Sequence, residues 1–256
     1  MSGLALHGIG VRFGGLVALD NVSMTVPPRS IVGVIGPNGA GKTTLFNVVC
    51  GFVKPDTGTM TLDGAPLRPR PHRLARLGIA RTLQGVGLFA GLTVLENVMV
   101  GAHSAARAGF GSALLGLPRS DRDERRLREH AMALLADLDV AEHAHKLPGV
   151  LPFALRKRVA LARALAARPR LLLLDEPAGG LGAEDLDRLA QLIRDLPKRA
   201  DDPCAVVLVE HHMDLVMSVC EHIVVLDFGR IVASGAPDEV RGDPRVTEAY
   251  LGAEAR

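Results

Sequence analysis

Apolar residues follow two patterns along the chain, short compact runs and longer stretches with helical spacing. Compact runs with almost no polar alternation lie at Ser30–Ile35, Leu171–Leu174, Ala205–Val209 and Ile223–Leu226. Such runs are typical of strands that are buried on both faces of a parallel sheet. Segments of helical character separate the last three runs, so the pattern predicts an α/β fold with a mostly parallel sheet.

The N-terminal part and the middle of the chain differ from this pattern. From Leu4 to Val26 short strand-like segments alternate with Gly-rich breaks, and Thr59–Leu62 followed by Asp63-Gly64 predicts a further strand and a tight turn. Residues from about 96 to 166 are dominated by Ala, Leu, Arg and Glu at helical spacing. We therefore expect an antiparallel β subdomain at the N-terminal end and an inserted helical subdomain.

The C-terminal part predicts a turn at Asp227–Arg230, a short strand at Ile231–Ala233 and a polar helical tail from Asp238. The chain shows no internal repeat and no low-complexity linker. These features predict a single domain over residues 1–256. Within it, residues of approximately 1–84 and 167–256 are expected to form the core with the β subdomain, and residues 85–166 the helical subdomain.

Composition narrows the function only slightly. The 256 residues are enough to bury a sizeable core, and a formal net charge of +2 is too small to indicate nucleic acid as a partner. Cys50, Cys204 and Cys220 form no metal-ligand spacing, so we expect reduced and mostly buried thiols. No window approaches the ~18 uninterrupted apolar residues of a membrane span. We therefore expect a cytoplasmic protein unless a partner holds it at a membrane.

A phosphate-loop motif, G-x-x-x-x-G-K-[ST], lies between a compact strand run and a helical segment, Thr43–Val49. In such a loop, backbone N–H groups and a helix N-terminus converge on phosphate oxygens. Lys42 is expected to reach the β- and γ-phosphates, and the Thr43 hydroxyl to ligate Mg²⁺. The motif predicts nucleotide binding but does not separate GTPases, kinases, helicases and transporters. The candidate nucleotide-binding residues here are Gly36, Pro37, Asn38, Gly39, Ala40, Gly41, Lys42, Thr43 and Thr44.

Two adjacent carboxylates, Asp175 and Glu176, follow the run Leu171–Leu174. Alternation along a strand is expected to send their side chains in different directions. Asp175 would then face Mg²⁺ through water while Glu176 faces the attacking water as general base, which suits metal-assisted phosphoryl transfer. Without the phosphate loop, the same residues would fit a polar turn after a strand about equally well.

A second polar group follows the next compact run. Glu210-His211-His212 comes directly after Ala205–Val209, at the strand end where open parallel sheets place their ligand sites. A single histidine at a strand end is usually structural. Because His211 follows the carboxylate strand by a plausible helix and strand interval, we interpret it as a γ-phosphate sensor and His212 as a bystander.

In this order the motifs resemble the nucleotide-binding domain of ABC transporters over nearly the whole chain. Phe13 lies where that family stacks an aromatic ring on adenine, and Gln84 matches its glutamine loop. Ala178–Leu181 matches its loop after the catalytic glutamate. The resemblance implies an ATPase that binds ATP and Mg²⁺, with Gln84 joining Thr43 and Asp175 at the metal and taking part in catalysis.

Within this family the chain looks most like the ATPases of branched-chain amino-acid importers. Urea and short-amide importers and a lipopolysaccharide exporter ATPase have similar stretches and stay open as alternatives. The resemblance rests on four stretches, which are Arg81–Gln84, Leu88-Phe89 with Leu92–Val98, Glu210-His211 with Leu215–Met217, and Ala249–Gly252.

The signature segment departs from the family pattern. The family has Leu-Ser-x-Gly before an Ala-Arg-Ala-Leu helix, whereas this chain has Leu151-Pro152-Phe153-Ala154. Pro152 offers neither a hydroxyl nor an N–H, and the Ala154 methyl obstructs a close backbone approach. Since each ATP in the family lies between one subunit's phosphate loop and the other's signature, this change predicts an asymmetric heterodimer. The alternative is that Pro152 and Ala154 are tolerated because the dipole of the helix beyond them still faces the phosphate, in which case a homodimer would hydrolyse ATP.

The resemblance also implies partners and a location. It implies two transmembrane permease subunits, a second ATP-binding subunit and, indirectly, an extracytoplasmic solute-binding protein, with this chain at the cytoplasmic face of the cell membrane. Leu88, Phe89 and Leu92 suit either a groove for a permease helix or ordinary subdomain core. Alternatives of another class are a soluble ABC protein of DNA repair or translation and a regulatory subunit that binds ATP without turnover.

Overall fold

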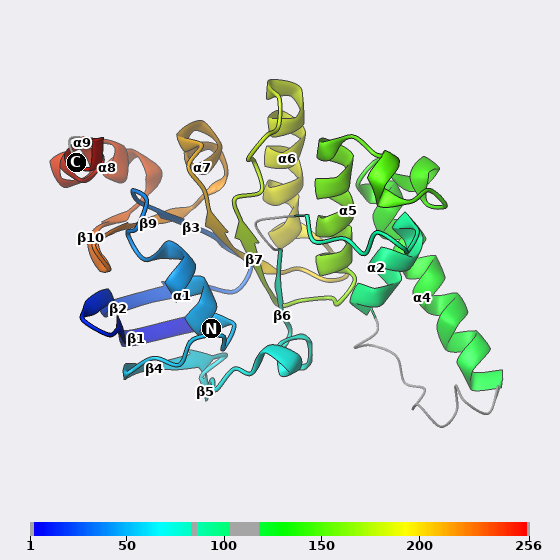
Figure 1. The fold of residues 1–256 in the computed structure, drawn as a ribbon, viewed down its shortest axis with the longest axis horizontal. Helices are drawn as coiled ribbons and strands as arrows, with labels where there is room; N and C mark the ends of the chain where they lie inside the picture. The colour runs from blue at the N-terminus through cyan, green and yellow to red at the C-terminus, as the bar shows by residue number, and fades with distance from the viewer. Residues whose placement is uncertain (1–2, 83–85, 103–117, 255–256) are drawn as a thin grey trace.

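The computed structural model describes residues 3–82, 86–102 and 118–254. Within these residues the centre is a six-stranded sheet (Figure 1). Its strands are β3 (Ile31–Ile35), β6 (Ile79–Arg81), β7 (Leu171–Asp175), β8 (Ala205–Val209), β9 (His222–Asp227) and β10 (Arg230–Gly235). They lie in the order β10-β9-β3-β8-β7-β6, all parallel except β10, which pairs antiparallel with β9.

The compact apolar runs are thus confirmed as parallel strands, and the reason is visible in the core. Along β3, Ile31 and Ile35 belong to one buried cluster, while Val32 and Val34 belong to the other on the opposite face of the sheet. Both faces are covered, so no polar alternation is needed. The short strand β6 was not predicted, because three residues show no periodicity.

An antiparallel sheet is formed by the N-terminal part, as expected. Its order is β2-β1-β4-β5, with strands β1 (Leu4–Phe13), β2 (Leu16–Val26), β4 (Thr57–Leu62) and β5 (Ala65–Pro66). Its buried face shares one core with α1 (Lys42–Val49), whose Phe46 side chain is 1% exposed. The phosphate loop and α1 are therefore fixed between the two sheets.

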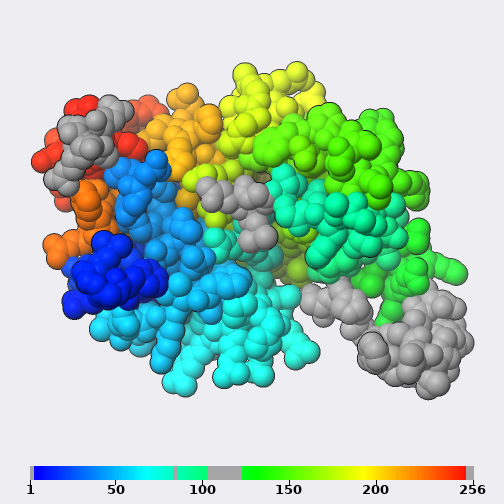
Figure 2. All heavy atoms as spheres, in the orientation of Figure 1, coloured from blue at the N-terminus to red at the C-terminus, as the bar shows by residue number. Residues whose placement is uncertain are grey.

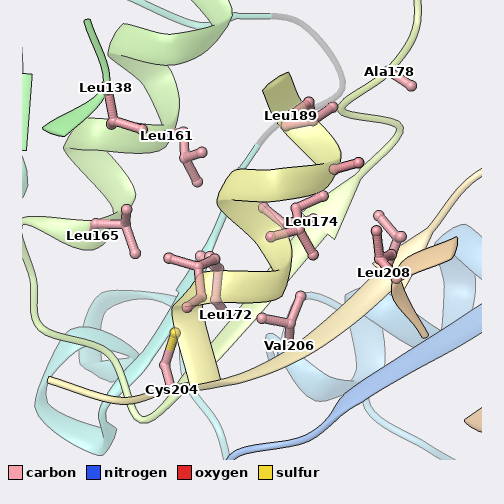
Figure 3. Close-up of a cluster of buried hydrophobic side chains, with 14 of the residues drawn as sticks. Leu138, Leu161, Leu165, Leu172, Leu174, Ala178, Leu189, Cys204, Val206 and Leu208 are labelled. Atoms are coloured by element: carbon pink, nitrogen blue, oxygen red, sulfur yellow. The ribbon is translucent and has the colours of Figure 1, made fainter. Parts of the chain in front are cut away.

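The other face of the central sheet is covered by α6 (Ala183–Asp195) and α7 (Met213–Val219). Figure 3 shows the part of this core in which Leu174 and Leu208 of the sheet lie near Leu189 of α6. Leu161 of the helix α5 (Phe153–Leu165) joins the same cluster. One continuous core therefore ties α5 to the strand that carries Asp175.

The helices α2 (Val94–Ala102), α4 (Pro118–Asp137) and α5 lie together at one end of the molecule (green in Figure 2). This agrees with the expected helical insertion, whose bounds of 85–166 stay a prediction.

The tail forms α8 (Pro237–Arg241) and α9 (Pro244–Glu254) near β10. Among the described residues, no helix has both the length and the apolar character needed to cross a membrane. Short 3₁₀ turns lie at Pro71–Arg73, Ala75–Leu77, Ala141–His143, Pro148–Val150 and Leu196–Lys198.

Candidate nucleotide-binding and hydrolytic site

The predicted site residues meet at one edge of the central sheet. β3 ends at Ile35 directly before the phosphate loop, β7 ends at Asp175, and β8 ends directly before Glu210 and His211. Parallel strands bring their carboxyl ends to the same edge, where open α/β sheets bind ligands. The topology therefore gathers the phosphate loop, two carboxylates and a histidine from three segments spread between residues 36 and 211.

The backbone of the phosphate loop requires glycine at two points. Gly36 has φ +148°, and a Cβ there would lie 2.0 Å from the carbonyl oxygen of Leu226. Gly41 has φ +106°, and a Cβ there would lie 2.6 Å from the carbonyl oxygen of Ala18. The loop passes so close to β2 and to the end of β9 that side chains at these positions would displace it.

Lys42 is buried beneath the loop, with 6% of its surface exposed. Its ammonium donates hydrogen bonds to the carbonyl oxygens of Gly36 at 2.6 Å and Pro37 at 2.8 Å. Burial lowers the pKa of Lys42, and the carboxylates of Glu176 and Asp175 oppose that shift. The loop cation and both carboxylates thus act on one another. Thr43 is exposed at the first turn of α1, and Thr44 is half-buried beside it.

Asp175 makes an ion pair that the sequence did not reveal. Its carboxylate accepts a hydrogen bond from Arg81 at 2.7 Å, and the two side chains are only 5% and 11% exposed. Arg81 also donates to Asn47 Oδ1 at 2.7 Å and stacks on Phe46 at 5.6 Å. The backbone N–H of Asp175 donates to the Thr82 hydroxyl at 3.2 Å. Arg81, at the end of β6, therefore fixes the carboxylate at the sheet edge.

We expect Arg81→Met to destabilise the protein by about 3 kcal/mol, because it leaves the Asp175 charge buried and unpaired. The measurement is thermal unfolding of Arg81→Met, Asp175→Asn and the double variant. Removing both charges is expected to cost less than the sum of the single changes. An Arg81→Met protein that melts at the wild-type temperature would show that the pair contributes nothing to stability.

Glu176 and Asp175 diverge for a reason other than the predicted strand alternation. Asp175 is the last residue of β7, whereas Glu176 has left the strand and has φ +47°, a left-handed conformation that non-glycine residues rarely adopt. Such backbone strain is often found at functional sites. Glu176 Oε1 lies 2.8 Å from His211 Nε2, so the predicted base and the predicted sensor are in direct contact.

Glu210 binds the backbone of the segment that follows Glu176, and it was not among the predicted site residues. It is 1% exposed, and its carboxylate accepts hydrogen bonds from the backbone N–H of Ala178 at 2.5 Å and of His211 at 2.9 Å. His212 also donates its backbone N–H to Glu210, at 3.3 Å, and stands at the N-cap of α7. A buried acidic residue directly after an apolar strand was the only sequence signal for this role.

Comparisons with known proteins agree with this geometry. A family model described as ABC transporter matches residues 19–179, which include the phosphate loop and both carboxylates. The chain belongs to the ABC transporter family. A second model, described as branched-chain amino acid ATP-binding cassette transporter, matches residues 230–256, the part that contains β10, α8 and α9.

Individual relatives of the ABC family extend the match over nearly the whole chain. The chain is 41% identical over 250 residues to the high-affinity branched-chain amino acid transport ATP-binding protein BraF of Pseudomonas aeruginosa, covering 97% of each. A crystal structure of the ADP conformation of an ABC transporter cassette superposes with a TM-score of 0.83, at 29% identity and 98% and 99% coverage. A dimeric bacterial ABC transporter cassette gives 0.76 at 25% identity and 91% and 98% coverage. The predicted fold class is confirmed.

Of the two residues assigned by the family resemblance, Phe13 and Gln84, the structure describes only Phe13. Phe13 lies at the end of β1, 51% exposed, on the hairpin whose other strand, β2, meets the phosphate loop at Gly41. Its position leaves the ring available to a ligand, and adenine stacking stays a prediction. Gln84 lies outside the described residues.

The oxygen atoms at this site fit Mg²⁺. Among the described residues, no group of three or more His, Cys, Asp or Glu side chains is arranged to hold a metal by itself. Mg²⁺ in phosphate-transfer sites is typically held by one or two carboxylates together with substrate phosphates and water. The Asp175 carboxylate, whose charge acts on Lys42, and the exposed hydroxyl of the adjacent Thr43 provide oxygen donors of that kind.

The signature segment lies at the start of α5. Pro152 is the N-cap residue, exposed and without a side-chain hydrogen bond to the helix, and Ala154 lies in the first turn. The Phe153 side chain is 40% exposed. A groove runs from this turn along α5 and α6 to the two carboxylates, and Ala154, Lys157, Leu161, Leu174, Asp175, Glu176, Pro177 and Leu189 line it.

The segment around Leu88 and Phe89, which was predicted to meet the permease, contains one core residue and one exposed residue. Leu88 packs against the main core, whereas Phe89 is 52% exposed. Asn97, fully buried in α2, accepts a hydrogen bond from the Phe89 N–H at 2.8 Å and donates to the Phe89 carbonyl at 3.1 Å. The structure thus presents Phe89 outward on a fixed backbone.

The three cysteines are buried and free, as expected.

Proposed function

We propose that this chain is the subunit that binds and hydrolyses ATP in an importer of branched-chain or other hydrophobic amino acids. The observation that carries the hydrolytic part is the contact between Glu176 and His211 at the sheet edge that also holds the phosphate loop. The 41% identity to a branched-chain amino acid transport protein over 97% of both chains supports the substrate class.

In this proposal ATP phosphates bind to the loop N–H groups and to Lys42, with Mg²⁺ held by Thr43 and Asp175. When bound, Mg²⁺ neutralises charge on the phosphate oxygens. Glu176 orients a water molecule and accepts its proton as the water oxygen bonds to the γ-phosphorus, while the bond to the β-phosphate oxygen breaks. His211, which lies 2.8 Å from the Glu176 carboxylate, holds that carboxylate and acts as the γ-phosphate sensor in this proposal.

We further propose an asymmetric heterodimer with a second ATP-binding subunit. The intact phosphate loop and carboxylates of this chain would face the partner's signature, and hydrolysis would occur there. The other site would receive the α5 N-terminus of this chain, where Pro152 provides no hydroxyl or N–H and Ala154 adds a methyl group. That site is expected to turn over slowly.

The experiment restores the signature in the variant Pro152→Ser with Ala154→Gly. In the complex with the partner subunit, this variant is expected to roughly double ATP turnover, because a second site begins to hydrolyse. The matched control, Pro71→Ser with Ala75→Gly, changes the same residue types at exposed positions away from α5. Unchanged turnover would show that the free N–H groups in the first turn of α5 already serve the phosphate, and the asymmetry would be withdrawn.

The remaining partners follow from the family, in which ATP-binding subunits work with transmembrane permeases. We propose two permease subunits that contact Phe89, a solute-binding protein on the far side of the membrane, and a location at the cytoplasmic face. Uptake of labelled leucine, urea and short amides by vesicles that contain the complex distinguishes the solutes. Uptake of urea or an amide, or outward movement of lipopolysaccharide, would replace the amino-acid proposal.

A further inference from the structure

Lys157 joins the signature helix to the loop that carries Glu176. Its side chain extends from the second turn of α5, and its ammonium donates hydrogen bonds to the carbonyl oxygens of Pro177 at 2.7 Å and Glu176 at 3.2 Å. Hydrogen bonds from a charged donor are about twice as strong as neutral ones. The bonds go to main-chain atoms, so they act on the course of the backbone at Glu176.

The rest of this loop is held from the core of the molecule. The Glu176 N–H donates to the carbonyl of Val209 at 2.9 Å, and the Ala178 N–H donates to Glu210 at 2.5 Å. These contacts fix the two ends of the segment. Between these two N–H groups, Lys157 holds the carbonyl groups of Glu176, which has φ +47°, and of Pro177. A left-handed backbone at a glutamate persists only where surrounding contacts maintain it.

The ammonium is held in place by its surroundings. It lies 5.2 Å from the centre of the Phe153 ring, one turn earlier on α5. The Phe153 ring in turn packs on Gly180, where a Cβ would lie 3.0 Å from the ring, with φ +75° at that glycine. Burial lowers the pKa of Lys157, and the carboxylates of Glu210 and Glu176 oppose this shift. The signature turn and the hydrolytic loop therefore meet at two points, Lys157 and Phe153.

We propose that Lys157 is a positioning residue for ATP hydrolysis, which holds the peptide of Glu176 so that its carboxylate stays against His211. The inference rests on the proposed role of Glu176 as general base. Because Lys157 and Phe153 belong to the same two turns of α5, a displacement of the signature moves the ammonium relative to the general base. The signature of this chain thereby acts on its own hydrolytic site, even where it binds the partner's phosphate poorly.

The experiment compares Lys157→Met and Lys157→Arg in the complex with the partner subunit. Lys157→Met is expected to lower kcat about tenfold with KM for ATP unchanged, because small displacements of catalytic groups cost rate rather than binding. Lys157→Arg, which keeps N–H donors, is expected to recover most of that loss. Lys198→Met, which removes a charge from an exposed lysine, is the matched control and is expected to behave as wild type.

A binding measurement separates positioning from a general structural effect. In the Glu176→Gln background, where hydrolysis is blocked, Lys157→Met is expected to leave the Kd for ATP unchanged. A normal kcat for Lys157→Met would overturn the inference, and so would a loss of ATP affinity or a failure of Lys157→Arg to recover activity. A wild-type complex that does not hydrolyse ATP would instead refute the proposed function itself, and this inference with it.

Discussion

Glu176→Gln is expected to lower ATP turnover by about two to four orders of magnitude, because glutamine cannot accept the proton of the attacking water. The amide has nearly the same size as the carboxylate and can still bond to His211, which lies 2.8 Å from Glu176 Oε1. Binding of ATP by the phosphate loop is therefore expected to stay near the wild-type level. The variant should accumulate the ATP-bound dimer.

The measurement is single-turnover hydrolysis of Mg²⁺-ATP by the complex, together with the Kd for ATP. Glu184→Gln is the matched control, since Glu184 is an exposed carboxylate in the first turn of α6 that pairs with Arg188. It is expected to hydrolyse ATP normally. If Glu176→Gln kept wild-type turnover, the general base would be another group and the proposed mechanism would be wrong.

Lys42→Met is expected to weaken ATP binding about a hundredfold, since charge-assisted hydrogen bonds to the phosphates are worth about 1.5–3 kcal/mol each. Without nucleotide the melting temperature is expected to change little. The variant loses two bonds to the Gly36 and Pro37 carbonyls, but it also removes the cost of burying an ammonium that is 6% exposed.

The measurement is the shift in melting temperature as Mg²⁺-ATP is added, since a ligand that binds only the folded state stabilises it by mass action. Wild type and the control Lys54→Met, at an exposed lysine, are expected to show the shift. Lys42→Met is expected to show almost none at the same concentrations. A full shift in Lys42→Met would mean that the nucleotide binds elsewhere on the molecule.

The central fold was predictable because strands buried on both faces of a sheet have uninterrupted runs of apolar residues in the sequence. Leu171–Leu174 has four consecutive apolar residues, and in the structure Leu172 and Leu174 face one buried cluster while Leu171 and Leu173 face the other. Strand β6 has only Ile79–Arg81 and no such run. It nevertheless places Arg81 against Asp175.

The site was predictable where a motif fixes local backbone, and less so where it depends on pairs from distant segments. The phosphate loop has its own glycines and helix, so its geometry follows from adjacent residues. The pairs Arg81 with Asp175 and Lys157 with Glu176 join residues 94 and 19 positions apart. Composition and periodicity do not determine such pairs, because each depends on how subdomains are placed against the sheet.

The divergence of Asp175 and Glu176 shows a correct expectation with an incorrect cause. Strand alternation would have separated their side chains, but the strand ends at Asp175 and the left-handed turn at Glu176 separates them instead. The turn is maintained by Glu210, Val209 and Lys157, none of which was predicted to act there. Long-range contacts therefore determine the detailed geometry of the predicted general base.

The most direct test of the account is steady-state ATP hydrolysis by this chain alone and mixed with the ATP-binding subunit encoded nearest to it, with Glu176→Gln as control. The account predicts low activity alone, a large rise on mixing and loss of that rise in the variant. Full activity of this chain as a homodimer would contradict it, because Pro152 and Ala154 would then form a working signature.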